Sequence, residues 1–153
     1  MKAARLNVAK LAVVSTVAVL TLGSLPAAAV EWSAVANTET QTVLVDRDSV
    51  HAYDGDVRAW VIHSYNQTES LGDMFPHRSK VMLYSFACEK RQLGYMQWSM
   101  QSGQFGGGQT VWADRVSYVT HYEAGNDLAD NALVDSVCAQ YARMTATTFA
   151  AAR

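Results

Sequence analysis

The fold of this chain is decided by residues 80–100, which read KVMLYSFACEKRQLGYMQWSM. Residues 80–88 have the alternation of a β-strand, and one of its faces carries Met82, Tyr84, Phe86 and Cys88. We expect that face to point into the core. The charged residues 89–91 (EKR) form a turn, and residues 92–100 return as the antiparallel partner, with Met96, Trp98 and Met100 aligned. The stretch therefore predicts a β-hairpin.

Further strand-like runs lie on both sides of this hairpin. β-Branched and aromatic residues predict strands over residues 31–37 (EWSAVAN), 42–46 (TVLVD) and 57–65 (VRAWVIHSY), with one or two more within residues 109–120. We expect residues 66–78, which carry Gly72 and Pro76, to form a loop. The glycine-rich residues 102–108 (SGQFGGG) form a hairpin connection. These elements favour an antiparallel sheet.

The hydrophobic period changes from two to that of a helix after Gly125. Asn126 or Asp127 is placed to cap a helix. The apolar residues that then recur at helical spacing are Leu128, Ala132, Leu133, Val137 and Tyr141. We expect this helix to pack on the sheet and the Ala- and Thr-rich tail from Thr145 onward to fray.

The chain has two cysteines, Cys88 and Cys138, which most simply form one disulfide in an exported protein. Cys88 is on the inward face of its strand, and Cys138 is beside the apolar stripe of the helix. A reactive thiol or a metal site is the alternative. However, the chain has no C-x-x-C motif, and no histidine has ligand spacing from either cysteine. In the chain-entropy model, a disulfide that closes a ring of fifty residues stabilises the fold by about 4 kcal/mol.

Residues 1–29 have the three parts of a cleavable signal peptide. Lys2, Arg5 and Lys10 make a positive start, residues 11–22 (LAVVSTVAVLTL) are apolar, and residues 27–29 (AAA) suit a signal peptidase. We expect cleavage after Ala29. A retained membrane anchor is the alternative, because the charge-free stretch from 11 to 30 approaches the roughly 20 residues that span a bilayer. No cysteine lies near the cleavage point, so we expect no lipoprotein.

The remaining residues 30–153 have the size of a single domain with a short C-terminal tail. They carry nine basic and 14 acidic residues, a net charge of −5. A domain this acidic is a poor general binder of nucleic acid or of an anionic membrane. We expect the chain to meet a membrane only through its signal peptide, and to end in the periplasm or outside the cell.

No pattern in the chain points to catalysis. The four histidines, His51, His63, His77 and His121, are far apart in sequence. A metal or haem site assembled in space, with Met74 or Met96, is the alternative to ordinary surface or strand histidines. The glycine-rich segment lacks the ending of a phosphate-binding loop, and there is no G-x-S-x-G. We therefore predict no enzyme, no metal site and no cofactor.

Two groups of side chains are candidates for binding. Arg78, Lys80, Lys90 and Arg91 are candidates to gather near one end of a hairpin and meet an acidic partner, although a solvated hairpin end has the same composition. Trp60, Trp98 and Trp112 are candidates for a ligand-binding face. Core packing against the helix is the alternative that we favour for the tryptophans.

The order of landmarks along the chain resembles the surface-adhesin protein E domain family. These landmarks are Trp32, residues 45–50 (VDRDSV), Val57 with Trp60, the run from Lys80 to Cys88, and Val137 with Cys138. The resemblance covers residues 30–138. It implies an α+β fold, in which an antiparallel sheet of about six strands packs against a C-terminal helix, with one disulfide between helix and sheet.

The resemblance also implies a function. The named adhesin of the family is an anchored surface lipoprotein that contacts host matrix proteins. We therefore expect an exported, non-enzymatic binding domain whose partner is an envelope or extracellular protein. A periplasmic small-ligand carrier or envelope accessory protein is the alternative, and an aromatic-lined cavity would favour it.

Overall fold

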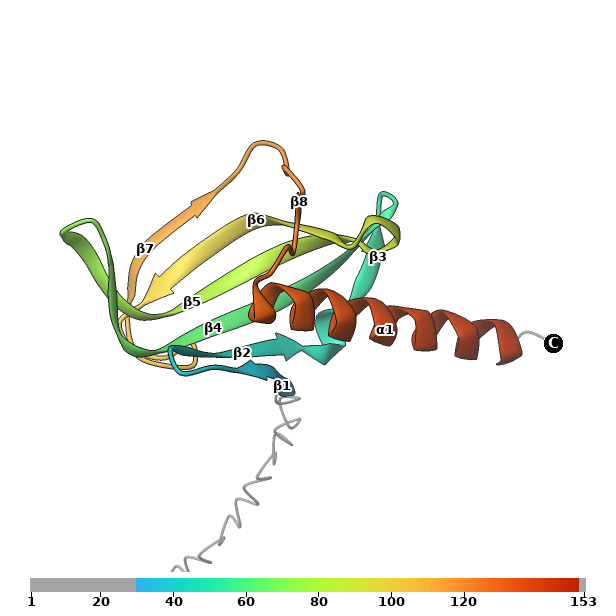
Figure 1. Ribbon diagram of the computed structural model, residues 1–153, viewed down its shortest axis with the longest axis horizontal. Coiled ribbons are helices and arrows are strands. Elements are labelled where there is room, and N and C mark those ends of the chain that lie inside the picture. The colour runs from blue at the N-terminus through green and yellow to red at the C-terminus, as the bar shows by residue number, and fades with distance from the viewer. Residues whose placement is uncertain (1–29, 152–153) are drawn as a thin grey trace, which may run out of the picture.

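The computed structural model describes residues 30–151, so the expected signal peptide at 1–29 lies outside the described residues. Residues 30–151 form an eight-stranded antiparallel sheet with one α-helix against it (Figure 1). The strands are β1 (Trp32–Asn37), β2 (Gln41–Asp46), β3 (His51–Tyr53), β4 (Asp56–Leu71), β5 (Met74–Ala87), β6 (Gln92–Gln101), β7 (Thr110–Arg115) and β8 (Tyr122–Glu123). The helix α1 spans Leu128–Ala151, and the short 3-10 turns Arg47–Ser49 and Cys88–Lys90 follow β2 and β5.

The expected α+β fold is confirmed. Six strands follow one another across the sheet in the order β1-β2-β4-β5-β6-β7, while the short β3 pairs with β4 and the short β8 with β6. The hairpin of β5 and β6 lies within this order, and Met82 of β5 is paired with Trp98 of β6. A register shift between Leu83 and Tyr84 lets Tyr84 pair with Tyr95.

The prediction of a loop over residues 66–78 is wrong. β4 and β5 instead continue as a two-stranded ribbon to a tight turn, where Leu71 is paired with Met74 and Gly72 adopts φ +61°. Pro76 is tolerated because the pairing of β5 with β6 begins only at Ser79, so the proline occupies a stretch with no neighbour on that side. The ribbon projects beyond the rest of the sheet (Figure 1).

The helix begins where the sequence predicted and ends later. The Asp127 carboxylate accepts hydrogen bonds from the backbone N–H groups of Ala129 and Asp130, at 2.8 and 2.9 Å, and so caps the first turn. The buried stripe is Ala129, Leu133, Val134 and Val137. Leu128, which we placed on this stripe, is 78% exposed, because it lies on the outward side of the helix, in line with the exposed Asp135 two turns later.

The expected frayed tail is helical through Ala151. Alanine has the highest helix propensity of any residue, which favours continuation in the Ala-rich sequence. The hydroxyl groups of Thr145, Thr147 and Thr148 donate to carbonyl oxygens one turn back, at 2.9 to 3.2 Å. These bonds satisfy the threonine side chains within the helix, which continues past the end of the sheet (Figure 1).

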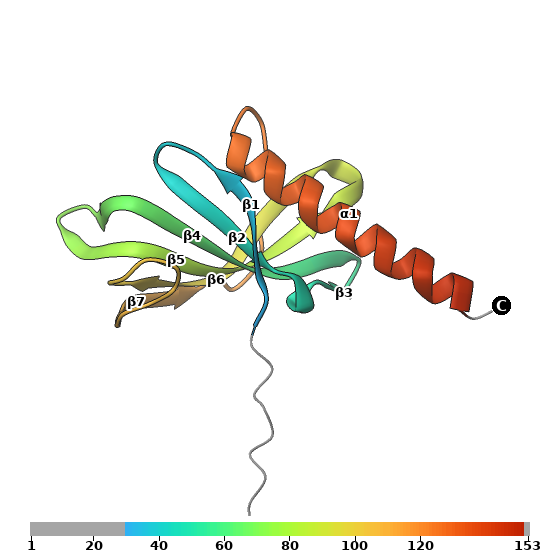
Figure 2. The same cartoon turned by 90° about the horizontal axis from the view of Figure 1, so that it is seen from below.

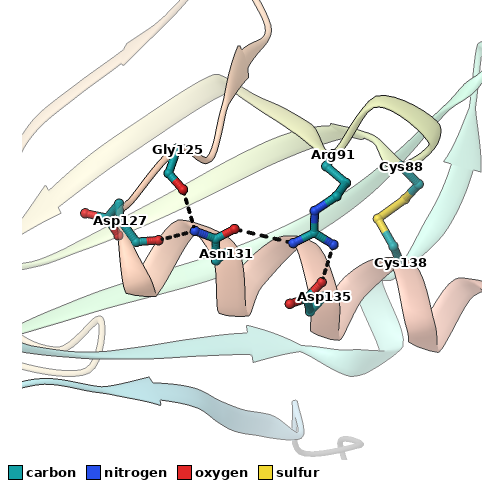
Figure 3. Close-up of polar contacts among 7 residues, drawn as sticks. All are labelled: Cys88, Arg91, Gly125, Asp127, Asn131, Asp135 and Cys138. Atoms are coloured by element: carbon teal, nitrogen blue, oxygen red, sulfur yellow. Dashed lines mark hydrogen bonds and ion pairs between the residues drawn. A yellow bond between two sulfur atoms is a disulfide. The ribbon is translucent and has the colours of Figure 1, made fainter.

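Two side-chain links hold the helix to the turn between β5 and β6 (Figure 3). The predicted disulfide joins Cys88 to Cys138 and is confirmed. Beside it, the Arg91 guanidinium pairs with Asp135 and donates a hydrogen bond to Asn131 Oδ1 at 3.3 Å. Both partners of the Arg91–Asp135 pair are more than half exposed, so the disulfide is the stronger link.

The core lies between the sheet and the helix. Its buried members from four strands and α1 include Val43, Val45, Val57, Ala59, Val61, Phe86, Leu93, Leu133, Val134 and Val137. The loop between β6 and β7 lies on the other side of the sheet from the helix (Figure 2). Within residues 30–151, no helix combines the length and the apolarity needed to span a bilayer.

Candidate functional site

The helix covers only one end of the sheet (Figure 1). By strand register, the uncovered part of the same face carries aromatic and methionine side chains. An open groove of about 240 Å³ is lined there by Leu71, Lys80, Met82, Tyr95, Trp98 and Met100. We call this groove, together with the adjoining rings of Phe75 and Trp112, the aromatic face. It is made by β4, β5, β6 and β7, so a rigid sheet positions it.

Strand register sets the geometry of the aromatic face. Met82 lies opposite Trp98, and Met100 lies opposite Trp112. The Tyr95 and Trp98 rings meet edge to face with centroids 5.2 Å apart, and the Phe75 and Trp112 rings are 4.6 Å apart. Tyrosine and tryptophan side chains have few rotatable bonds, so they lose little conformational entropy when a partner binds.

Part of the aromatic face is exposed. Tyr95 is 41%, Trp112 38% and Leu71 53% exposed, whereas Met100 is buried. Single exposed apolar side chains are common, but neighbouring ones form a patch of the kind that marks interaction sites. The arrangement can therefore bind the apolar surface of a partner.

A single cation lies within the groove lining. Lys80 is paired with Met100 on β6 and with His63 on β4, and its ammonium nitrogen is 5.8 Å from the centre of the Tyr65 ring. A cation beside an aromatic ring is attracted by the ring face. Lys80 therefore adds a positive charge to an otherwise apolar surface, which suits a partner that presents a carboxylate next to apolar side chains.

A buried polar cluster separates the aromatic face from the core. His63 Nε2 lies 3.1 Å from the Tyr84 hydroxyl, and His63 Nδ1 lies 3.1 Å from Gln41 Oε1. Burial, reinforced by the charge of Lys80, lowers the pKa of His63 to about 4. Neutral His63 then donates from Nδ1 to Gln41 and accepts at Nε2 from Tyr84.

Tyrosines and one carboxyl group extend this cluster toward the helix. Burial raises the pKa of Tyr84 well above its ordinary value, and burial also raises the pKa of Tyr122, which lies beside Asp130. The pKa of Asp130 is itself raised by burial. His63 and Tyr84 are therefore uncharged near neutral pH, and with Gln41 they form a buried hydrogen-bonded group.

The comparison with protein families identifies the chain. The sequence model for surface-adhesin protein E matches residues 32–139, most of the chain. The chain belongs to the surface-adhesin protein E family. The matched region starts at β1 and ends one residue after Cys138, so it includes the whole sheet, the disulfide and the first half of α1.

Solved structures of Haemophilus influenzae protein E share the fold of this adhesin-E family member. Crystal form II has a TM-score of 0.52 and 13% identity, over 65% of this chain and 82% of that one. The selenomethionine form has a TM-score of 0.51 and 12% identity, over 70% and 92% of the two chains. A comparison with curated proteins gives no match. Family and fold together support an adhesin-like surface protein.

The four basic residues that we expected to gather in this family member are not brought together. Arg78 donates a hydrogen bond to the Asn66 carbonyl at 2.9 Å and lies near Lys80 on β5. Lys90 and Arg91 lie beyond the opposite end of the same strand, about 30 Å away at about 3.3 Å per residue. Arg91 is occupied by the helix, so only Lys80 belongs to the aromatic face.

The three candidate tryptophans lie on two faces of the sheet. Trp98 and Trp112 are part of the aromatic face, whereas Trp60 is paired with Leu83 on the face turned away from the helix. None of them belongs to the buried core, so the expectation that they pack against the helix is wrong. The helix reaches only the end of the sheet that carries Val57 and Phe86.

The other three histidines each contact a nearby oxygen atom. His77 is buried and contacts the Phe75 carbonyl, His51 contacts the Ser49 carbonyl, and His121 Nε2 lies 3.1 Å from Asp56 Oδ2. In the part of the chain that the structure describes, no group of three or more His, Cys, Asp or Glu side chains is arranged to hold a metal ion.

Sequence reasoning named Trp98 and Trp112 as candidates for a ligand-binding face but favoured core packing for them. The period-two alignment of Met82, Trp98 and Met100 correctly put these residues on the helix side of the sheet. Apolar residues on the helix side were then assigned to the core, because sequence does not tell how far along the strands the helix extends. The missing information was where α1 lies along the strands: its buried residues pack over the end of the sheet that carries Val57 and Phe86.

Proposed function

We propose that this protein is exported with removal of residues 1–29, and that the domain of residues 30–153 acts as a non-enzymatic adhesin-like module. In this proposal the aromatic face binds an extracellular or envelope protein. The observation that carries the proposal is the exposure of Tyr95 and Trp112 on a rigid sheet in a member of an adhesin family.

The chemistry of the aromatic face supports a protein partner. Tryptophan, tyrosine and methionine are enriched in protein interfaces, and a few buried aromatic residues contribute most of the binding free energy. Lys80 supplies one positive charge within the apolar surface. A partner loop that carries apolar side chains and one carboxylate has the matching chemistry.

The small volume of the groove beside Tyr95 argues against the aromatic face as the site of a small-ligand carrier. Pockets for small ligands usually enclose about 300 Å³ or more and bury most of the ligand. The groove beside Tyr95 is about 240 Å³ and open. Such a groove receives a side chain of a larger partner better than it encloses a free molecule.

Site-specific photocrosslinking tests the proposal. A benzoylphenylalanine replaces Trp112 in one version of the full chain and Tyr118, which is 79% exposed and outside the aromatic face, in the matched control. Cells that export each version are illuminated in the presence of extracellular matrix extract. We expect one saturable protein adduct from position 112 and none from position 118. Equal adducts from both positions, or none from position 112, would contradict the proposal.

A further inference from the structure

A second groove lies on the face of the sheet turned away from the helix. Strand pairing places four side chains in a row across it: Trp60 is paired with Leu83, Leu83 with Gln97, and Gln97 with Arg115. Directly opposed residues share a face of the sheet. The row therefore runs from a tryptophan on β4 to an arginine on β7 over about 14 Å, three strand spacings.

The loop between β6 and β7 borders one side of this row. The Ser79 hydroxyl donates to the Gly103 carbonyl at 2.7 Å and accepts from the Gly106 N–H at 3.0 Å. The Ser64 hydroxyl accepts from the Phe105 N–H at 3.1 Å. Gly106 lies so close to Ile62 that a Cβ atom there would be 3.2 Å from its side chain. The loop is thus fixed on the sheet as a wall.

The segment between β7 and β8 borders the opposite side. A Cβ atom on Gly94 would lie 2.6 Å from the carbonyl oxygen of Thr120, so only glycine permits the segment to cross there. His121 follows and reaches Asp56 and Ser85 on the same face. Between the two walls lies an open groove of about 460 Å³ whose lining includes Trp60, Gln97, Ser99 and Arg115.

Each lining residue offers a different kind of contact. The half-buried Trp60 provides a flat ring whose negative face attracts the partly positive C–H groups of a sugar ring. Gln97 both donates and accepts hydrogen bonds, and Ser99 does so with its hydroxyl group. The exposed Arg115 has no carboxylate within ion-pairing distance among residues 30–151, so its guanidinium is available.

We propose that this groove binds a carboxylate-bearing saccharide. One sugar ring stacks on Trp60, ring hydroxyl groups exchange hydrogen bonds with Gln97 and Ser99, and the carboxylate pairs with Arg115. A guanidinium holds a carboxylate with two parallel hydrogen bonds. The site is separate from the aromatic face and independent of the protein partner proposed above.

Asp114 also borders the groove. Its carboxylate repels an anionic ligand only weakly, because strand register directs the side chain to the other face of the sheet. Asp114 is paired with Trp98, so its side chain belongs to the helix side of the sheet. Its Oδ1 accepts the backbone N–H of Arg115 at 2.7 Å. The groove offers the Ser99 hydroxyl, the Gln97 amide and the Arg115 guanidinium beside the flat ring of Trp60. This combination suits a sugar. An extended peptide would instead require apolar side-chain pockets along the groove.

Titration of the exported protein, produced from the full chain, tests this site. Sialyllactose is the acidic probe, lactose the neutral control, and triglutamate the peptide control. The tryptophan indole N–H resonances report binding. We expect sialyllactose to shift the Trp60 resonance, with lactose binding at least tenfold more weakly, and Trp112→Phe to leave both affinities unchanged.

The variant Arg115→Gln separates charge from stacking. It is expected to fold normally, since the side chain is exposed at the sheet edge, and to lower the affinity for sialyllactose at least tenfold without changing that for lactose. Trp60→Phe should weaken both sugars. No shift at Trp60, an unchanged sialyllactose affinity in Arg115→Gln, or triglutamate binding as tightly as sialyllactose would each overturn the proposal.

Discussion

The disulfide between Cys88 and Cys138 gives the most quantitative prediction. It closes a loop of 50 residues. In the chain-entropy relation, this bond lowers the entropy of the unfolded chain by about 14 cal/mol/K. The unfolded chain is thereby destabilised by about 4 kcal/mol at 25 °C. A domain of this size loses about 4 °C in Tm per kcal/mol. The double variant Cys88→Ser/Cys138→Ser should therefore unfold about 15 °C below the wild-type protein.

Thermal unfolding followed by circular dichroism measures this effect. The helix signal and the tryptophan signal should shift together, because the buried stripe of α1 around Leu133 is part of the common core. Arg91→Gln is the matched control: it removes the exposed ion pair beside the disulfide and should shift Tm far less. A shift of the double variant no larger than that of Arg91→Gln would refute the reasoning.

The remaining predictions concern the core, its pH dependence and export. Leu133→Ala should lower the free energy of unfolding, measured with urea, by about 3 kcal/mol, because Leu133 is fully buried. The control is the surface variant Arg143→Ala. A smaller loss for Leu133→Ala than for this control would contradict the place of Leu133 in the core. Because the pKa of His63 is about 4 when folded and 6.5 when unfolded, protonation favours the unfolded chain, and stability should fall by about 3 kcal/mol as pH drops from 6.5 to 4. His63→Gln should flatten that slope, and an unchanged slope would exclude His63 as its source. Mass spectrometry of the exported protein should find Val30 at its N-terminus, whereas an intact residue 1 would indicate a retained anchor.

Local sequence patterns predicted the parts of the fold that local physics determines. The alternation through Tyr84 and Phe86 gave the inward face of β5, and the cap at Asp127 gave the start of α1. The pairing of Cys88 with Cys138 followed from their number and from the expected export. In each of these cases the deciding residues lie close together in sequence, or the alternatives are few.

The errors arose where a neighbour distant in sequence decides the outcome. Residues 66–78 contain turn-forming residues, yet they pair with each other as a ribbon that needs no third strand beside Pro76. Trp98 and Trp112 are large apolar side chains of the kind found in a core, but they lie on a part of the sheet that the helix does not cover. Lys80 and Lys90 are close in sequence, but the strand between them holds them apart.

The candidate site could be predicted only in part for the same reason. Lys80 was expected to meet a partner and does lie in the exposed aromatic face. Arg91 was also expected to meet a partner, but it pairs with Asp135 of the helix. Charge alone does not distinguish a cation that is available to a partner from one that holds two elements together.

The most direct test of a binding role for the aromatic face is a measurement of affinity for the partner protein that crosslinking identifies. The affinity of the double variant Tyr95→Ala/Trp112→Ala is compared with that of the control Tyr118→Ala. Each aromatic residue at the centre of an interface contributes about 2 kcal/mol, or about 30-fold in affinity. We predict a loss of at least 30-fold in the double variant and a change of less than about twofold in the control. Equal affinities for the two variants, with both folded, would contradict the assignment of the aromatic face as the binding surface.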